Sequence, residues 1–184
     1  IEAKIIELGA KPAFPVNLSI NDISAHYTPS YDDIILAHGL LKIDFGVHID
    51  GLIADTAFSV DLENSEQNKK LIKASEEALE KSLELIKQNP KTELNKIGSL
   101  ISKTIESKGF SPIINLSGHS IEEYELHSGI TIPNIDDKKN LELKQGLYAI
   151  EPFATLSTGS GKVYDGKLSG IYSLIQRKPI RSMT

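Results

Sequence analysis

The sequence has no cysteine, no tryptophan and a single methionine among its 184 residues. The absence of cysteine excludes a disulfide scaffold, a thiolate metal site and a cysteine nucleophile. Histidine and carboxylate side chains are therefore the strong metal ligands that remain. The chain also lacks an apolar run near the roughly 20 residues that a membrane-spanning helix needs, and it shows no signal-peptide pattern at its start. We therefore expect no membrane association.

Basic residues are outnumbered by acidic ones, 20 against 25, which gives a net charge of -5. This balance argues against nucleic-acid binding as the main role. With 40% hydrophobic and 24% charged residues, the composition is that of an ordinary soluble chain. Its length is enough for one domain with a substantial core, so we expect a single domain over residues 1–184.

The segment 41–62 is the most informative part of the sequence. Apolar residues occupy every second position from Ile43 to Ile49, which is the period of a β-strand. The dipeptide Asp50-Gly51 that follows is a strong signal for a two-residue hairpin turn. The sequence therefore predicts a β-hairpin whose register is fixed by this turn.

The predicted register brings two aspartates together. A two-residue turn at positions 50 and 51 places Gly46 opposite Asp55, and it places Ala57 opposite Asp44. Both carboxylates then point from one face as diagonal neighbours, roughly 7–8 Å apart at the backbone, and Gly46 leaves space for a shared ion. The alternative is two unrelated acids on a solvated face. Ile53 shares that face with Asp55, so an acid there needs a partner, and a divalent cation is the candidate.

The rest of the chain reads as an α+β fold, with antiparallel strands and helices gathered on one face. Ile1 to Leu8 has the pattern of the last turns of a helix. Asn64 and Ser65 are candidate N-caps of a helix that ends at Asn89, and Gln67 would complete a capping box with Asn64. A second helix runs from Leu94 to near Gly109. The expected further strands are Phe14 to Ile20, Pro112 to Leu116, Leu147 to Ala154 and Ile171 to Arg177.

Two polar residues lie in or next to apolar strand-like runs. His119 follows Gly118 at what we expect to be the exit of a short strand, although a lone histidine there is more often structural. Glu151 lies inside the apolar run Leu147 to Phe153, where an unpaired carboxylate is costly to bury. Glu151 is therefore predicted to need a cation.

The other histidines carry weaker signals. His26 lies in a turn before Thr28 and Pro29 and is either a surface residue or a substrate contact. His127 is weaker still by itself. His38 and His48 have no identifiable partner and are interpreted as structural.

Two aspartates, one histidine and one glutamate make a mostly oxygen donor set. Such a set suits Mn, Fe(II), Co or Zn. Two ions that share a bridging carboxylate would hold a water between them and make it a nucleophile at neutral pH, which is the machinery of metal-assisted hydrolysis.

These residues resemble a known family. The segments that carry the resemblance are Ala13 to Pro15, Ala25 to Pro29, Lys42 to Gly46 with Asp55, Asn115 to Ile121 with Tyr124 and His127, and Tyr148 to Glu151. In order and spacing they are similar to the methionine aminopeptidases of type 2, found in archaea and eukaryotes. The Ala-His-Tyr-Thr-Pro segment resembles type 2 more than type 1.

The resemblance implies a pita-bread fold and a metal-dependent hydrolase that removes the N-terminal methionine from nascent polypeptides with a water bridging two divalent ions. Carried over by motif, Asp44 would chelate one metal and Asp55 would bridge both. His119 and Glu151 would hold the other metal, and Glu151 would also act as the general base.

The resemblance also implies the substrate contacts. His26 and His127 would hydrogen-bond the substrate and stabilise the developing charge. Phe14 and Leu126 resemble walls of the pocket for the methionine side chain. The expected partner is a Met-initiated peptide or nascent N-terminus, with proximity to the ribosome left open. The family is cytoplasmic and monomeric in this interpretation.

The sequence departs from the family pattern at both ends. The family has an N-terminal helical segment before the position of Ile1. It also continues beyond Arg181 through a helical insertion to a last strand with a fifth metal ligand, a bridging glutamate. No Glu or Asp follows Asp165. We therefore expect a partial catalytic domain over 1–184, whose second metal ion, left to Asp44 and Asp55, binds weakly and whose activity alone is impaired.

Two other functions stay open at this stage. One is a catalytically silent pita-bread module that binds the ribosome or a partner protein. The other is a related dinuclear aminopeptidase, such as a proline-directed enzyme, which the segments around His26 and His127 oppose. Hydrolysis of Met-Ala-Ser compared with Ala-Pro separates these functions.

Overall fold

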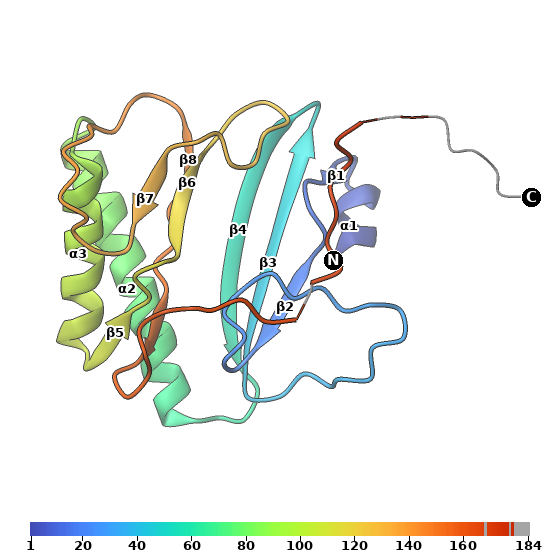
Figure 1. Cartoon of the computed structure of the whole chain (residues 1–184), viewed down its shortest axis with the longest axis horizontal. Helices are drawn as coiled ribbons and strands as arrows, with labels where there is room; N and C mark the ends of the chain where they lie inside the picture. The colour runs from blue at the N-terminus through green and yellow to red at the C-terminus, as the bar shows by residue number, and fades with distance from the viewer. Residues whose placement is uncertain (168, 177, 179–184) are drawn as a thin grey trace, which may run out of the picture.

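The computed structural model describes residues 1–167, 169–176 and 178. Two long helices lie at one side, a long two-stranded hairpin crosses the middle, and the N-terminal helix lies at the other side (Figure 1). The elements in chain order are α1 (Glu2–Glu7), β1 (Lys11–Pro12), β2 (Asn17–Ile20), β3 (Leu40–Ile49), β4 (Leu52–Asp61), α2 (Glu66–Gln88), α3 (Leu94–Ser107), β5 (Phe110–Pro112), β6 (Ser117–Ile121), β7 (Thr131–Pro133), β8 (Leu147–Ala149) and β9 (Ala154–Leu156).

The β3–β4 hairpin has the register that the sequence predicts. Ile49 pairs with Leu52, and the antiparallel ladder continues along the full length of both strands. Asp50 and Gly51 form the turn with φ values of 48° and 91°. Positive φ at both central residues is the geometry of a type I′ turn, whose twist matches that of the flanking strands. The local sequence therefore fixes which side chains share a face.

β1 and β2 pair with the other edge of β3, which completes a four-stranded antiparallel sheet. The strand predicted from Phe14 begins only at Asn17, so its first half was wrong. Pro15 explains the late start, because proline has no N–H to donate to a ladder. The side-chain Nδ2 of Asn17 donates to the Pro15 carbonyl oxygen at 3.2 Å.

The two long helices agree with the sequence pattern, with one change at a cap. Ser65 is the N-cap of α2, and its hydroxyl accepts a hydrogen bond from the Asn68 N–H at 3.3 Å. The capping box expected between Asn64 and Gln67 is therefore wrong, because the helix starts one residue later. Asn89 is the C-cap, as expected from the proline after it.

α2 and α3 pack together and cover the sheets of the second half of the chain. Ile97, Ile101 and Ile105 of α3 are at most 1% exposed and form the centre of the core. Ile132 of β7 joins them, and partly buried residues of β5, β8 and β9 pack around this cluster. The apolar stripe of α3 therefore faces the strands that carry the later motifs, which agrees with the expected α+β arrangement.

The strands after α3 are shorter than expected. β6 pairs with β7 on one side and β8 on the other, and β5 pairs with β9. The strand predicted at Pro112 to Leu116 is wrong beyond Pro112, because β5 ends at that residue and β6 begins only at Ser117. The strand predicted at Leu147 to Ala154 is split into β8 and the start of β9. Residues 171–176 form no strand, and Arg177 lies outside the described residues.

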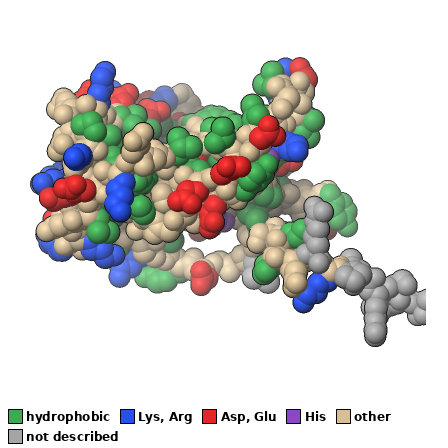
Figure 2. Space-filling model, turned by 90° about the horizontal axis from the view of Figure 1, so that it is seen from above, with side chains coloured by type: hydrophobic (Ala, Val, Ile, Leu, Met, Phe, Trp, Pro, Cys, Tyr) green, Lys and Arg blue, Asp and Glu red, His purple; other side chains and the backbone are tan. Residues whose placement is uncertain are grey.

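The described surface is mixed in charge. Seen from above, acidic side chains spread across the middle of one face, and lysines gather toward the end that holds the long helices (Figure 2). Several large apolar residues of the loop between β2 and β3 are exposed, among them Tyr31, Ile34 and Leu36. Within the described ranges, no helix combines the length and apolar character that a bilayer crossing requires.

Candidate metal centre

The hairpin brings Asp44 and Asp55 to one face. Asp55 pairs with Gly46 across the ladder, and Asp44 pairs with Ala57, as predicted from the turn. Side chains of diagonal neighbours in an antiparallel pair point to the same side of the sheet. The side chain of Asp55 is 11% exposed, so this face is not an open one.

His119 lies in the middle of β6 and not at a strand exit. It pairs with Thr131 of β7 and with Ala149 of β8. Gly118 lies inside the strand and does not end it. A glycine is needed there because a Cβ would overlap the Ala149 carbonyl oxygen. The glycine permits close approach of two strands, and this was the physical meaning of the sequence signal.

Glu151 lies in the stretch between β8 and β9, where the β6–β8 ladder has ended. Its side chain is 30% exposed, so the carboxylate is half-buried and is not enclosed in a strand as expected. Pro152 follows directly and cannot take part as a ladder donor. The break in the strand turns the carboxylate toward β6.

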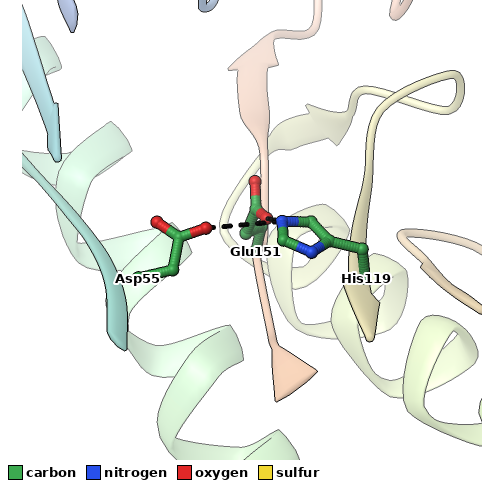
Figure 3. Close-up of side chains that lie close together, drawn as sticks. All are labelled: Asp55, His119 and Glu151. Carbon is green, nitrogen blue, oxygen red and sulfur yellow. Dashed lines mark ion pairs between the residues drawn. The ribbon is translucent and has the colours of Figure 1, made fainter. Parts of the chain in front are cut away.

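These three side chains meet at one point (Figure 3). The Nε2 atom of His119 lies 3.4 Å from Oδ2 of Asp55 and 3.0 Å from Oε1 of Glu151. Their ligand atoms all lie within 4.8 Å of one another, and within the described residues they form the one such group of three or more acidic, histidine or cysteine side chains. Asp55 reaches this point from β4, and His119 reaches it from β6.

The carboxylates hold a proton on His119 when no metal is bound. Burial lowers the pKa of His119, but the hydrogen bonds to Asp55 and Glu151 and the charge of Glu151 outweigh it and raise the pKa to about 10. His119 is therefore an imidazolium at neutral pH in the metal-free protein. Its Nδ1–H donates to the Ser120 carbonyl oxygen at 3.3 Å.

Asp44 lies beside this group without belonging to it. Burial, followed by the charges of Asp55 and Glu151, raises the pKa of Asp44 to about 7. The carboxylate therefore senses both acids of the group. The structure brings three of the four predicted metal ligands into mutual contact and leaves Asp44 at the edge of the group.

The donor set fits a divalent cation. It combines one imidazole nitrogen with two carboxylates, which suits borderline and hard ions. The bond from Nδ1 of His119 to a backbone carbonyl is the arrangement that orients the ring and leaves Nε2 for a metal. Burial contributes most to the raised pKa of Asp44, the charges of Asp55 and Glu151 add to it, and a bound cation would relieve that repulsion.

Two further histidines lie near this group. The ring of His127 lies 4.2 Å from the ring of His119, measured between centroids. Burial and then the charge of His119 lower the pKa of His127, and His26 acts in the same direction. His127 is therefore a neutral imidazole at pH 7, able to donate one hydrogen bond. His26 is exposed and has a φ of 63°.

The space over Gly46 is not empty, which corrects the expectation that an ion occupies it. A Cβ on Gly46 would meet Cε1 of Phe14 at 2.5 Å. Because Gly46 pairs with Asp55, the ring of Phe14 covers the same face as the Asp55 carboxylate. Phe14 therefore forms an apolar wall beside the site. Leu126 is half-buried and lies next to His127 in the chain.

Some supporting residues were not found from the sequence. The Ser128 hydroxyl donates to the Ser120 hydroxyl at 2.7 Å, and the Ile130 N–H donates to Ser120 Oγ at 3.0 Å. These bonds close the loop that carries His127. His48, interpreted as an unpartnered structural residue, contacts the ring of Tyr124 edge-on at 5.8 Å between centroids. Single hydroxyls and long-range ring contacts leave no pattern in a sequence.

Comparison with known proteins explains this constellation. A model of metallopeptidase family M24 matches residues 1–178. The chain belongs to this family. The M24 chain is 49% identical over 184 residues to a methionine aminopeptidase of Methanocaldococcus jannaschii, a match that covers 98% of the chain and 60% of that relative. It is 47% identical over 156 residues to a methionine aminopeptidase of Methanothermus fervidus, covering 78% of the chain and 82% of that relative.

The M24 chain spans only part of several relatives. It covers 60% of the length of the Methanocaldococcus jannaschii protein and 61% of a Pyrococcus abyssi methionine aminopeptidase that is 50% identical to it. The resemblance to the archaeal methionine aminopeptidases, inferred from motifs, is confirmed by these matches.

Solved structures confirm the pita-bread fold. The methionine aminopeptidase of Rickettsia prowazekii matches with a TM-score of 0.79 at 27% identity, covering 92% of the M24 chain and 71% of that chain. The methionine aminopeptidase of Thermotoga maritima matches with a TM-score of 0.72 at 30% identity, covering 82% of the M24 chain and 64% of that chain. A prolidase of Pyrococcus horikoshii, at 22% identity and a TM-score of 0.63, shares the fold.

Proposed function

We propose that the protein carrying this M24 chain removes the N-terminal methionine from peptides and newly made proteins. The observation that carries the proposal is the convergence of Asp55, His119 and Glu151 from separate elements. The family and the methionine aminopeptidase relatives support the same reaction.

The three converging side chains would hold a divalent ion through two carboxylates and one imidazole. A bound ion supplies Lewis-acid polarisation of the scissile carbonyl and lowers the pKa of a water. Glu151 is the half-exposed acid of the group, and we assign it the role of general base, which accepts a proton from the attacking water. Removing such a base typically costs about 10²–10⁴-fold in rate.

We assign a second ion to Asp44 together with Asp55. Asp44 lies at the edge of the group and feels the charges of Asp55 and Glu151, so a cation between them would stabilise both acids. Fewer side chains of this chain are available to that ion, so we expect it to bind more weakly than the first. Co, Mn, Fe(II) and Zn all suit the donor types.

His127 and His26 would contact the substrate. The ring of His127 lies beside that of His119 at a tilt of 56°, and its lowered pKa keeps it neutral, so that it can donate a hydrogen bond to the scissile carbonyl. Phe14 offers an apolar wall beside Asp55, which suits an unbranched side chain such as methionine. Leu126 is the other wall in this proposal.

The proposed substrate indicates where in the cell the reaction takes place. Chains that begin with methionine are made by ribosomes, so we place the activity in the cytoplasm and close to the site of synthesis. A monomer is enough in this proposal, because the converging residues all belong to one chain.

Peptide hydrolysis tests the proposal. The purified protein is loaded with Co(II) or Mn(II) and given Met-Ala-Ser and Ala-Pro in parallel. Release of methionine from the first peptide with little cleavage of the second is expected. Preferred cleavage of Ala-Pro would identify a proline-directed enzyme. Tight metal binding without cleavage of either peptide would favour a binding module. Glu151→Gln should lower turnover by about 10²–10⁴-fold while leaving the protein folded.

A further inference from the structure

A buried asparagine outside the ligand set joins the two segments that carry His119 and Glu151. Asn134 follows β7 and is 0% exposed. Its Nδ2 donates to the Leu116 carbonyl oxygen at 2.9 Å, and its Oδ1 accepts from the Phe153 N–H at 3.2 Å. Both polar ends of the amide are therefore used.

The two partners of Asn134 flank the candidate ligands. Leu116 directly precedes β6, the strand that carries His119. Phe153 lies just beyond Glu151 in the stretch between β8 and β9. The β6–β8 ladder ends at the pair His119 and Ala149, so it does not reach Glu151.

Few other bonds fix this stretch. The Phe153 carbonyl oxygen accepts from the Ile113 N–H at 2.9 Å, which ties the stretch to the segment after β5. The β6–β8 ladder holds the stretch to β6 on one side of Glu151, and the hydrogen bond from the Phe153 N–H to Asn134 holds it to the start of β6 on the other side. The distance between the His119 and Glu151 side chains therefore depends on the side chain of Asn134 together with this ladder.

The chemistry of the residue supports this role. The neighbours of Asn134 in the chain are Ile132, Pro133 and Ile135, which are apolar, and a buried polar group is costly unless it is hydrogen-bonded. Leucine has a similar branched shape and would avoid that cost, if only packing mattered. A carboxamide supplies one donor and one acceptor on a rigid planar group, which neither a carboxylate nor an alkyl group offers.

We infer that Asn134 is a positioning residue of the metal site, which holds Glu151 at the distance from His119 that a shared ion requires. The inference rests on the proposed metal site. It assigns no contact between Asn134 and the ion or the substrate, because its amide is used by the backbone of both segments. Outer residues that orient ligands typically contribute about 10–100-fold to metal affinity.

The test uses Co(II) binding by calorimetry and the visible absorption spectrum of the bound ion. Asn134→Leu should weaken Co(II) binding by about 10–100-fold and change the spectrum. Ser82→Ala is the matched control, because it removes another buried side-chain bond, from Ser82 Oγ to the Ala78 carbonyl oxygen, inside α2. The control should bind within twofold of the wild type with an unchanged spectrum.

A second variant decides the case where Asn134→Leu does not fold. Asn134→Asp keeps the shape and the acceptor for Phe153 but loses the amide donor to Leu116, so weaker Co(II) binding and a changed spectrum are again expected. A folded variant at this position with wild-type affinity and spectrum would overturn the inference.

The outcomes separate this inference from the proposed function. Tight Co(II) binding by the wild type without methionine release, together with a loss in Asn134→Leu, would contradict only the proposed function. A wild type that binds no Co(II) would overturn both.

Discussion

Among the individual side chains, His119 sets the electrostatics of the site. Its Nε2–H faces two carboxylates, and its pKa is raised to about 10, so a proton occupies the position that a metal would take. Metal and proton therefore compete for one nitrogen atom. Asp44 adds a second titration, because burial and its acidic neighbours raise its pKa to about 7.

This competition predicts proton release on metal binding. At pH 7.5 we expect about one proton from His119 when the first ion binds, with a fraction more from Asp44. Metal affinity should rise about tenfold for each pH unit between 7 and 9. Calorimetry of Mn(II) binding in two buffers with different ionisation enthalpies measures the number of protons. His119→Ala should lose the main part of the release, and a wild-type value near zero would contradict the assignment.

The same pKa shifts predict how the metal-free protein responds to pH. The His119 pKa lies above its ordinary value of 6.5, so its contribution to stability is full below pH 6.5 and is lost as the pH rises through 10. The Asp44 pKa is raised from 3.8 to about 7, so its protonated form stabilises the fold at low pH and that contribution is lost by pH 7. Both effects make the metal-free protein less stable as the pH rises.

Urea unfolding in the presence of a chelator checks this sign. The urea concentration at the unfolding midpoint of the metal-free protein should decrease as the pH is raised from 6 to 9. In His119→Ala the fall should be smaller, since the main titrating group is gone. A midpoint that rises over this range would show that the charges act in another way.

The strands and helices differ in how well local sequence determines them. The β3–β4 hairpin could be predicted residue by residue, because a two-residue Asp50-Gly51 turn allows one register and so fixes the face of Asp44 and Asp55. The apolar stripe of α3 was equally informative. These signals are carried by neighbours in the chain.

The short strands around the site could not be predicted in the same way. β6 and β8 are defined by pairing with distant segments. From the sequence alone Gly118 suggests the end of a strand, because the Ala149 carbonyl oxygen that requires a glycine there comes from a distant segment. Glu151 was found because a carboxylate in an apolar run needs a partner. Asn134, equally polar in an apolar run, follows the same logic and was missed.

The turn of the hairpin gives a prediction for one element. Gly51 has a φ of 91°, and a Cβ there would meet the Tyr124 ring at 2.5 Å. Gly51→Ala should therefore lower the free energy of unfolding by about 1–3 kcal/mol. Gly166→Ala is the control, because no atom lies within 4 Å of a Cβ at that position. Chemical denaturation of both variants makes the comparison, and equal stabilities would refute the strain at the turn.

Across the chain as a whole, the candidate ligands link two separate sheets. Asp55 belongs to the sheet of β1 to β4, and His119 to the sheet of β6 to β8. Within the described residues no strand of one sheet pairs with a strand of the other. The backbone bond from Tyr124 N–H to the Gly51 carbonyl oxygen, at 3.0 Å, connects the hairpin tip to the loop after β6.

A metal that binds only the folded state should stabilise this arrangement. At a free metal concentration 100 times the dissociation constant the gain is about 2.7 kcal/mol, which raises the melting temperature by roughly 5–10 °C for a chain of this size. Thermal unfolding with Mn(II) and with a chelator measures the difference. Asp55→Ala should remove most of the shift, and Gly166→Ala should retain it.

The Tyr124 contact joins the two sheets at the hairpin tip, and the side chains of Asp55, His119 and Glu151 bring them together again at the candidate metal centre. Withdrawal of the cation should let the two sheets swing about that tip, while each sheet keeps its own hydrogen bonds. A pair of spin labels, one on β2 and one on β7, would then report a broader distance distribution in chelator than in Mn(II). The spacing of the two sheets in this M24 chain would then depend on whether a cation is bound.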